Sequence, residues 1–398
     1  MKDKATLFKC KRVVLALILL VVVSAACSSR RADSLQNNYP EFSWDHIPRY
    51  MHVWDKTSFT DEELDYLAEF HFITFEKWQG TLEGSVQEGT LKAARAVKER
   101  NPKAKILYYK NIVIDWPSAM SKELETIEGG HLQSQDGTVP IFYGAKFCDI
   151  SLPEVQEWWI RDATQMLEDP SIEGLFVDAN MKILVEAFFA ERGVGPDKIK
   201  ALRVGYDKIL TEINKDLRPD NIILANLIRA RLEDGGLGYL GYFDGSYLEG
   251  FLGAVGGVSK KDYVAKGITC AQEAARQGKI VAFCNRLSVQ PNEGTDIDEA
   301  GNPDSKLNYD PERLDYLTAI FLVIAEKYSY LYIHGGYGVG PESEIDNPFW
   351  LETLPVFEKR LGPPKGAATR DGYIYTREFE HCSVWLDIEN ETAKLTWR

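Results

Sequence analysis

The sequence predicts an α/β protein, a (β/α)₈ TIM barrel with a small C-terminal β module. From about Pro48 onward, short β-branched or aromatic runs alternate with longer amphipathic stretches. This alternation is typical of parallel β/α units, and eight such units over about 290 residues match a TIM barrel. The competing arrangement, a doubly wound open sheet, is disfavoured because no glycine-rich phosphate loop follows the first predicted strand.

The strands are predicted from short apolar runs bounded by turn residues. They span Arg49–Trp54, Phe72–Lys77, Ala104–Asn111, Gly174–Asn180, Ile222–Asn226, Gly241–Gly245, Lys279–Asn285 and Tyr330–Gly335. A capping box at Thr60 opens the first predicted helix. Further helices are expected over Gly89–Arg100, Pro153–Glu168, Pro196–Leu217, Ser259–Arg276 and Pro311–Lys327. The helix expected after Asn226 is weak because Gly235-Gly236 interrupts it early.

Two stretches depart from the regular alternation. The connection from Asn111 to Ser151 is about 40 residues long and rich in aromatic residues, and loops of that length in compact domains are usually functional. The tail predicts three short strands, Gly372–Thr376, Ser383–Asp387 and Ala393–Trp397. We therefore expect a barrel over residues 46–362 and a β module over residues 363–398.

The first residues predict export. Residues 1–26 combine a basic start, an apolar run from Val13 to Val23 and small residues, as a signal peptide does. Ser24-Ala25-Ala26-Cys27 resembles a bacterial lipobox, so Cys27 is the predicted lipidation site and residues 27–45 the tether. We expect a protein anchored by lipid to the cell envelope, at a bacterial outer membrane facing the periplasm or the surface. A signal peptide cut near Ala26 and an uncleaved anchor helix are the alternatives.

Composition narrows the partners. The formal net charge is −14, which argues against nucleic acid and other anionic polymers as partners because an acidic surface repels them. It is more compatible with neutral or cationic substrates. Cysteines 148, 270, 284 and 382 lack metal-type spacing, so they are expected to be buried free thiols, with a disulfide as the alternative. No sequence motif indicates a metal or cofactor. The expected partners are a carbohydrate substrate and, through the anchor, a membrane.

The candidate chemistry lies where strands end, because TIM-barrel active sites form at the C-terminal ends of the strands. Asp178 follows the buried run of GLFVDAN, and Glu249 in SYLEGF lies just past the sixth predicted strand. Glycoside hydrolysis needs two carboxyl groups. Asp178 is the candidate nucleophile and Glu249 the candidate acid, with Tyr247 and Phe251 as the aromatic surroundings that would raise its pKa.

Other polar or aromatic side chains near predicted strand ends are candidates for binding sugar hydroxyls or sugar faces. Glu76 and Asp244 are also reserve candidates for the acid. The full set of predicted substrate-binding residues is Glu76, Trp78, Lys110, Asn111, Asn180, Asn226, Asp244, Tyr247, Asn285 and His334. Whether the reaction retains or inverts the anomeric configuration is left open, because the separation of the two carboxyl groups decides it.

Through YYKN, GLFVDAN and YLEGF, residues 46–398 resemble the hypothetical glycosyl-hydrolase-like barrels of bacterial lipoproteins. They are more distantly similar to endo-α-1,4-polygalactosaminidases and to the α-galactosidase clan. This resemblance implies a glycosidase, with Asp178 after the fourth strand as nucleophile and Glu249 after the sixth as acid/base. Two alternatives are a glycan-binding surface lipoprotein without chemistry, and another hydrolase or a lyase that uses Lys110 or His334 as its base.

Overall fold

The structure is a computed structural model that describes residues 38–116, 118–253, 257–287, 310–340 and 350–398. The chain divides into two units, Met1–Tyr39 and Pro40–Arg398, and the fold below is that of the second. The predicted signal peptide and Cys27 lie outside the described residues. Within the described ranges, no helix is long and apolar enough to cross a membrane.

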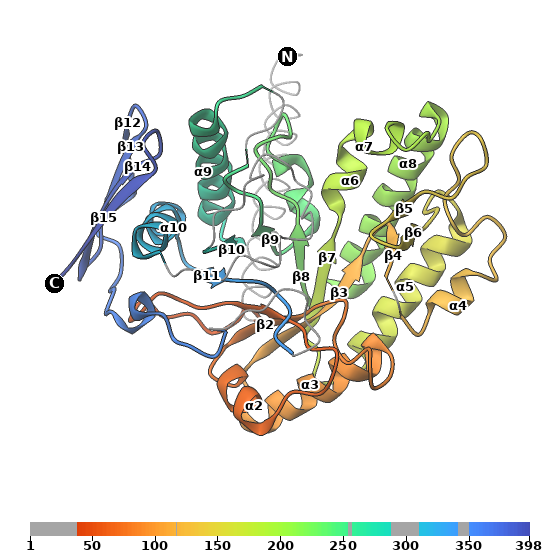
Figure 1. The fold of residues 1–398 in the computed structure, drawn as a ribbon, viewed down its shortest axis with the longest axis horizontal. Coiled ribbons are helices and arrows are strands. Elements are labelled where there is room, and N and C mark those ends of the chain that lie inside the picture. Colours follow the sequence, from red (N-terminus) through yellow and green to blue (C-terminus); the bar gives the residue numbers. More distant parts are fainter. Residues whose placement is uncertain (1–37, 117, 254–256, 288–309, 341–349) are drawn as a thin grey trace, which may run out of the picture. The chain divides into compact units, whose positions relative to one another are not determined.

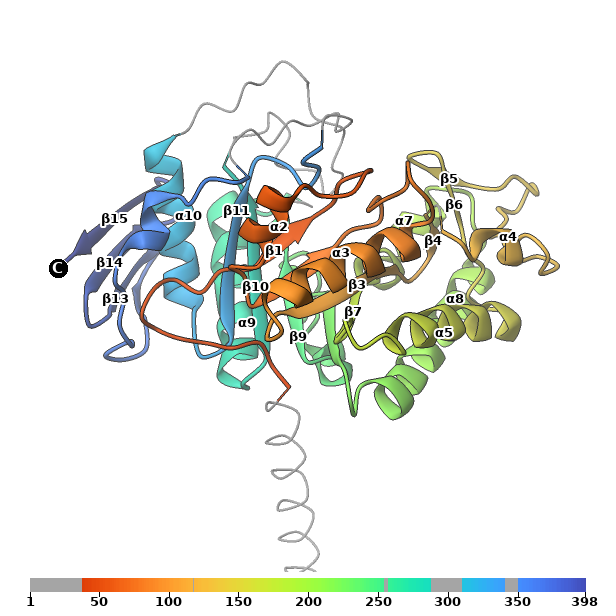
Figure 2. The same ribbon diagram turned by 90° about the horizontal axis from the view of Figure 1, so that it is seen from below.

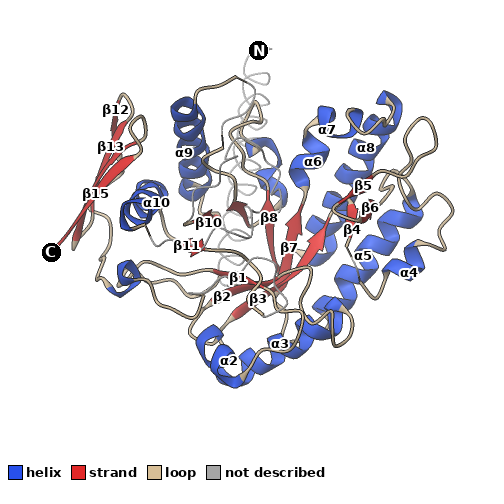
Figure 3. Ribbon diagram, in the orientation of Figure 1, coloured by secondary structure: helices blue, strands red, loops and turns tan. Residues whose placement is uncertain are grey.

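Within these ranges, eight parallel strands follow one another around a nearly closed barrel (Figures 1 and 3). Their order in the sheet is the order in the sequence. The last strand returns to the first through a parallel bridge between Arg49 and Leu331, where Tyr50 N donates to the Leu331 carbonyl at 3.0 Å. The strands are β1 (Met51–Val53), β2 (Phe72–Phe75), β3 (Lys105–Asn111), β7 (Gly174–Asp178), β8 (Ile222–Asn226), β9 (Gly245–Leu248), β10 (Ile280–Arg286) and β11 (Ser329–His334). The predicted fold class is confirmed.

Helices surround the strands, and their starts follow from local sequence. Thr60 and Ser85 each form a complete capping box, with Glu63 and Glu88 respectively. Such boxes satisfy two backbone N–H groups that the first turn leaves unpaired. The second of these helices therefore begins before the predicted Gly89. The helices that cover the barrel are α2 (Asp61–Leu67), α3 (Val86–Arg100), α5 (Pro153–Leu167), α8 (Pro196–Glu212, continued by a π-helical turn to Leu217), α9 (Lys260–Arg276) and α10 (Pro311–Ile324).

The sixth barrel strand was predicted too early. It was expected at Gly241–Gly245, but β9 spans Gly245–Leu248 and the residues before it, Leu237–Tyr242, form a 3-10 helix. Gly235 and Gly236 precede that helix with φ of 69° and 86°, a left-handed conformation that glycine adopts at little cost. Asp244 therefore lies at the amino end of β9, while Glu249 follows its carboxyl end.

The long connection after β3 folds into an antiparallel sheet of its own at the carboxyl end of the barrel. It contains β4 (Ile114–Asp115), β5 (Ile141–Phe142), β6 (Ala145–Phe147) and the short helix α4 (Ser121–Leu124). The C-terminal tail forms a separate antiparallel sheet that packs against α10 (Figures 1 and 2). Its strands are β12 (Thr369–Asp371), β13 (Ile374–Glu378), β14 (Cys382–Asp387) and β15 (Thr392–Trp397), one more than predicted. The domain boundaries placed in the sequence stay predictions.

Aromatic rings fill the inside of the barrel. His52 packs edge-on against Phe176 with 4.8 Å between ring centroids, and Phe176 packs against Tyr247 at 5.1 Å. All three side chains are buried. Edge-to-face packing of this kind stabilises a core beyond the effect of burial alone. The filled interior supports the polar side chains that stand above it at the carboxyl ends of the strands.

Candidate active site

Asp178 and Glu249 meet at the carboxyl end of the barrel through one amide group. Asp178 is the last residue of β7, Asn226 is the last of β8, and Glu249 directly follows β9. The Asn226 Nδ2 group donates to Asp178 Oδ1 at 3.0 Å and to Glu249 Oε2 at 2.9 Å. Since both oxygens bond one nitrogen, they lie within about 6 Å of each other, a spacing used by glycosidases.

Neutral donors hold the carboxylate of Asp178 in place. Its Oδ2 accepts from the Tyr109 hydroxyl at 2.5 Å and from Asn111 Nδ2 at 3.3 Å. Asn111 is itself fixed, because its Oδ1 accepts from the backbone N–H of Val113 and Ile114. The residue after Asp178, Ala179, has a left-handed φ of 65°. Non-glycine residues adopt that conformation at some cost, and such strain is often found beside functional side chains.

Glu249 is bound by a cation and a tyrosine in addition to Asn226. Its Oε2 pairs with the guanidinium of Arg229 at 3.2 Å, and its Oε1 accepts from the Tyr337 hydroxyl at 2.9 Å. The Tyr337 hydroxyl also hydrogen-bonds the hydroxyl of Tyr247 at 2.7 Å. Tyr247 is therefore placed behind Tyr337, inside the barrel, where it orients the group that touches Glu249.

Glu76, the reserve candidate for the acid, is a buried counter-ion. Both of its oxygens bond Lys77 Nζ, at 3.0 and 2.7 Å, and His52 Nε2 lies 3.3 Å from Oε1. Burial alone would raise the pKa of Glu76, but Lys77 and His52 outweigh it and lower this pKa to about 2. A carboxyl group that stays ionised at neutral pH cannot donate a proton, so Glu76 does not fit the role of the acid.

Lys77 connects this ion pair to the two catalytic candidates and to aromatic residues. Burial would lower the pKa of Lys77, but the charges of Glu76, Asp178 and Glu249 raise it above its ordinary value. Its Nζ lies 5.3 Å from the ring centroid of Trp116, and Trp116 packs edge-on against the half-buried Trp78 at 6.0 Å. The predicted Trp78 is thus part of an aromatic pair beside the acids.

Sequence reasoning missed three charged or polar residues of this site, Lys182, Arg229 and Tyr337, and noted Lys77 only as the end of the second predicted strand. Each lies within four residues of the end of a barrel strand. The loops that follow parallel strands line the same face of a TIM barrel. The short distance of these residues from a strand end could therefore have indicated that they belong to the site. The prediction considered mainly the strand ends themselves and gave these loop residues no role in the site.

The prediction for Lys110 is wrong, because its side chain points away from the barrel mouth. Side chains alternate along a strand, so Tyr109 and Asn111 face Asp178 while Lys110 faces the helix layer. There its ammonium forms an ion pair with Asp162 of α5 and lies 4.5 Å from the ring centroid of Trp158. A lysine used in this way cannot serve as the base of a hydrolase or lyase at the mouth.

Asn180 and Asp244 also lie apart from a substrate. Asn180 is fully buried, where its Nδ2 donates to the Val177 carbonyl at 2.7 Å and its Oδ1 accepts from Tyr206 at 2.8 Å. Asp244 is 1% exposed at the amino end of β9 and pairs with Arg218 at 3.0 Å. Both predictions of substrate contact are therefore wrong, since these groups are occupied inside the protein.

Asn285 and His334 are buried at the ends of β10 and β11. Among the described residues, neither hydrogen-bonds Asp178 or Glu249. His334 stacks between Tyr332 and Tyr337, with ring centroids 5.0 and 4.4 Å away. Burial lowers the pKa of His334 well below its ordinary value, so the ring is neutral at pH 7. Among the described residues, Tyr337 is what connects His334 to the two acids, and the predicted contact of His334 with substrate stays a prediction.

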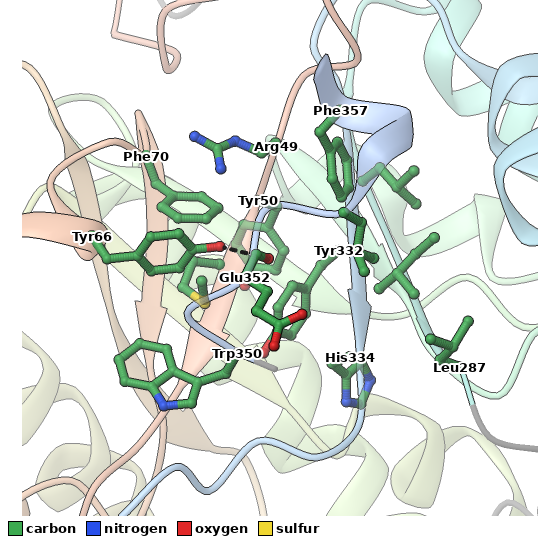
Figure 4. A pocket seen from close by; sticks show the side chains of 14 residues that line it. Arg49, Tyr50, Tyr66, Phe70, Leu287, Tyr332, His334, Trp350, Glu352 and Phe357 are labelled. Atoms are coloured by element: carbon green, nitrogen blue, oxygen red, sulfur yellow. Dashed lines mark hydrogen bonds between the residues drawn. The ribbon is translucent and has the colours of Figure 1, made fainter. Parts of the chain in front are cut away.

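Figure 4 shows a cavity at the seam between β1 and β11, lined by Tyr332, His334 and Trp350. In its wall the Tyr66 hydroxyl donates to the Glu352 carbonyl at 3.3 Å. The cavity volume is about 30 Å³, room for one or two water molecules but not for a sugar ring. The seam cavity is therefore not the substrate site.

The described part of the chain holds no cluster of three or more His, Cys, Asp or Glu side chains that could bind a metal ion. Cys148, Cys270, Cys284 and Cys382 are buried free thiols, as predicted. Cys284 lies in the barrel interior, 3.8 Å from the Tyr337 hydroxyl. Burial raises the pKa of this thiol, so it stays protonated at neutral pH and is a poor nucleophile.

With this geometry in place, sequence comparison identifies the family. The model described as "Hypothetical glycosyl hydrolase family 15" matches residues 98–383, which include both Asp178 and Glu249. The chain belongs to this family. As a member of this glycosyl hydrolase family, the protein is a glycosidase. No curated protein matches the sequence.

Several solved structures are similar to the chain at low sequence identity. The glycoside hydrolase domain of PelA from Pseudomonas aeruginosa is 12% identical, covers 61% of this chain and 85% of its own, and gives a TM-score of 0.42. The maltogenic α-amylase AmyB from Thermotoga neapolitana is 11% identical, with 86% of each chain covered and a TM-score of 0.48. The α-L-fucosidase isoenzyme 2 from Paenibacillus thiaminolyticus is 13% identical, covers 76% of this chain and 47% of its own, and gives a TM-score of 0.46.

Proposed function

We propose that this member of the family hydrolyses an O-glycosidic bond of a polysaccharide or oligosaccharide with retention of the anomeric configuration. Asp178 is the nucleophile and Glu249 the acid/base. The observation that carries this proposal is the Asn226 amide that bonds both acids, at 3.0 and 2.9 Å. It keeps Asp178 Oδ1 within about 6 Å of Glu249 Oε2, and this short oxygen–oxygen distance supports the closer carboxyl spacing of retaining enzymes, roughly 5–5.5 Å, over the roughly 6.5–9.5 Å of inverting ones.

The hydrogen bonds of Asp178 favour one of its oxygens as the nucleophile. Oδ2 already accepts from Tyr109 and Asn111, whereas Asn226 is the one donor to Oδ1 among the described residues. In the first step Asp178 Oδ1 attacks the anomeric carbon, and the bond from that carbon to the leaving oxygen breaks. Asn226 and Tyr109 hold the carboxylate so that little reorganisation is needed as its charge is lost to the new ester bond.

Glu249 supplies the proton for the leaving oxygen. Its Oε2 accepts from Asn226 and Arg229, so the proton of the acid form belongs on Oε1, beside the Tyr337 hydroxyl. That hydroxyl also bonds Tyr247, and either tyrosine can donate in that bond. Tyr337 can therefore donate to the ionised Glu249 and accept from its protonated form. In the second step Glu249 takes a proton from water, whose oxygen attacks the anomeric carbon and releases Asp178.

Azide rescue of a Glu249→Ala variant tests these roles. On a panel of aryl glycosides with good leaving groups, the variant should form the glycosyl–Asp178 ester but turn over slowly. Added azide should then restore turnover and give a glycosyl azide of retained configuration, identified by proton NMR. An azide product of inverted configuration would make Glu249 the nucleophile instead. Binding of glycans without any product from the wild type would favour a binding protein.

We also propose that the enzyme acts at the cell envelope, held there by a lipid on Cys27. The proposal rests on the sequence of residues 1–27, which lie outside the described structure. Cells that express the full chain should incorporate radiolabelled palmitate into it, and Cys27→Ser should abolish both this label and recovery in the membrane fraction. A Cys10→Ser variant is the matched control. Equal labelling of the Cys27→Ser protein would refute the anchor.

A further inference from the structure

Lys182 follows Asp178 by four residues, and none of the described carboxylates forms an ion pair with it. It is in α6 (Asn180–Leu184), the short helix that begins two residues after Asp178. The charges of Asp178 and Glu249 both act on its ammonium group. Among the described residues, however, no hydrogen-bond acceptor or carboxylate lies within bonding distance of Lys182 Nζ.

Aromatic rings frame this ammonium group. Lys182 Nζ lies 4.8 Å from the ring centroid of Phe142 and 5.4 Å from that of Phe188. Phe142 belongs to β5, in the long connection after β3, and Phe188 to α7 (Glu186–Ala190). The guanidinium of Arg192 covers the Phe188 ring at 3.7 Å. The rings restrict the position of the ammonium and reduce its contact with water, but they supply no negative charge.

Lys182 differs in this respect from two other cations near the acids. Lys77 bonds both oxygens of Glu76, and Arg229 pairs with Glu249. Burial lowers the pKa of Lys182, against the opposing effect of Asp178 and Glu249. The charged form of Lys182 thus carries a desolvation cost that no neighbouring ion pair offsets. An anion that enters with the substrate would offset it, whereas a neutral sugar hydroxyl would do so much less.

The acidic composition of the chain does not rule out such a contact. The formal net charge of −14 repels an anionic polymer at long range, but salt screens that repulsion beyond about 8 Å. A carboxylate in contact with Lys182 is therefore governed mainly by the nearby ammonium group.

We propose that Lys182 determines specificity for a sugar that carries a carboxylate, and that the substrate class of this enzyme is a uronic-acid-containing glycan. This inference rests on the proposed function, because it places the uronosyl residue next to Asp178 and Glu249. The ammonium of Lys182 binds the sugar carboxylate as a charge-assisted hydrogen bond, and the rings of Phe142 and Phe188 exclude water from that contact.

The test uses pairs of polysaccharides that differ only in charge. Pectate, alginate, heparosan and a glucuronan are each prepared intact and after chemical reduction of their carboxyl groups to hydroxymethyl groups. Release of reducing ends is measured with the wild type, Lys182→Met, Lys182→Arg and Asp178→Asn. Lys200→Met is the control, since Lys200 is an exposed lysine of α8 (side chain 78% exposed).

For at least one pair, the wild type should cleave the intact polymer with a kcat/KM roughly 10- to 100-fold above that for the reduced polymer, the expected effect of one charge-assisted hydrogen bond. Lys182→Met should remove this preference, so that the variant cleaves the intact and the reduced polymer with similar kcat/KM. Lys182→Arg should keep part of the preference, and Lys200→Met all of it.

Different results would overturn the role of Lys182 and the catalytic roles of Asp178 and Glu249. If the wild type cleaves the reduced polymers as fast as the intact ones, or cleaves none of the intact ones, the proposal for Lys182 is overturned. A preference that survives in Lys182→Met overturns it as well. None of these results affects the assignment of the acids. That assignment fails if Asp178→Asn releases reducing ends at the wild-type rate.

Discussion

The two ends of the barrel each hold carboxylates paired with arginine, and they are built differently. At the carboxyl end, the side chain of Glu249 is 28% exposed and pairs with Arg229. At the amino end, Asp244 is sealed from solvent, where Arg218 and the backbone N–H of Ile223 occupy its two oxygens. Burial raises the pKa of Asp244, although Arg218 opposes this. One pair is open to a substrate and the other is closed.

This difference shows that residue type and nearness to a strand do not by themselves identify a catalytic carboxylate. In a TIM barrel the carboxyl ends of the strands carry function and the amino ends carry stability. We therefore expect substitutions of Asp178, Glu249 and Asn226 at the mouth to change activity with little change in stability. Substitutions at the amino end should do the opposite.

The largest effect is expected for Asp178→Asn. The amide keeps the size of the side chain but cannot attack the anomeric carbon, so kcat should fall by about 10⁴-fold or more. The midpoint of thermal unfolding should stay within a few degrees of the wild type. Asp197→Asn, a change of a fully exposed aspartate on α8, should leave both quantities unchanged. Wild-type activity in Asp178→Asn would contradict a catalytic role for Asp178.

Asn226→Ala should be the next most damaging change at the mouth. Without its amide, neither carboxylate is held at its present position, and loss of one such donor typically lowers kcat by about 10²- to 10³-fold. Steady-state kinetics on a soluble aryl glycoside would measure this. If KM rises and kcat is unchanged, Asn226 binds substrate and does not position the acids.

Asp244→Asn tests the other end of the barrel. The substitution leaves the charge of Arg218 buried without its partner, which should lower the free energy of unfolding by about 3 kcal/mol. Urea denaturation measures the loss, and kcat/KM at a temperature where the variant is folded should equal that of the wild type. Should the variant keep full stability but lose activity, the division between the two ends would be wrong.

Glu76→Gln should change the pH dependence of the free energy of unfolding. The pKa of Glu76 is lowered from 4.5 to about 2 in the folded protein, so its ionised form stabilises the fold above about pH 4.5. That contribution is lost as the pH falls from 4.5 to about 2. Glu76→Gln should therefore be less stable than the wild type at pH 7, and the difference should shrink over this acidic interval. A constant difference across that interval would contradict the assigned ion pair.

The smallest effect is expected for Tyr337→Phe. Loss of the hydroxyl removes one hydrogen bond to Glu249, worth about 1.5–3 kcal/mol at a charged acceptor. We expect kcat to fall by about 10-fold and the limb of the pH–rate profile that belongs to Glu249 to move to higher pH, because its ionised form loses a donor. An unchanged profile with lower kcat would indicate a merely structural tyrosine.

Much of the barrel could be predicted from the sequence because its strands are short buried runs with clear boundaries. The strand predicted at Gly241–Gly245 was misplaced because YLGYFD mixes apolar residues with a glycine. Such a mixture is compatible with a 3-10 helix as well as with a strand. The direction of Lys110 could have been predicted from strand alternation with Tyr109. The contacts of Arg229 and Tyr337 with Glu249 could not, since they depend on how loops after separate strands fold over one another.

The most direct test of the central claim is to trap the intermediate and map it. The wild type is incubated with 2-deoxy-2-fluoro glycosides that carry a good leaving group, and the protein is digested and analysed by mass spectrometry. We expect one added glycosyl group, on the peptide that contains Asp178, and none in Asp178→Asn. A glycosyl group on Glu249, or rapid turnover to a product of inverted configuration without any covalent intermediate, would contradict it.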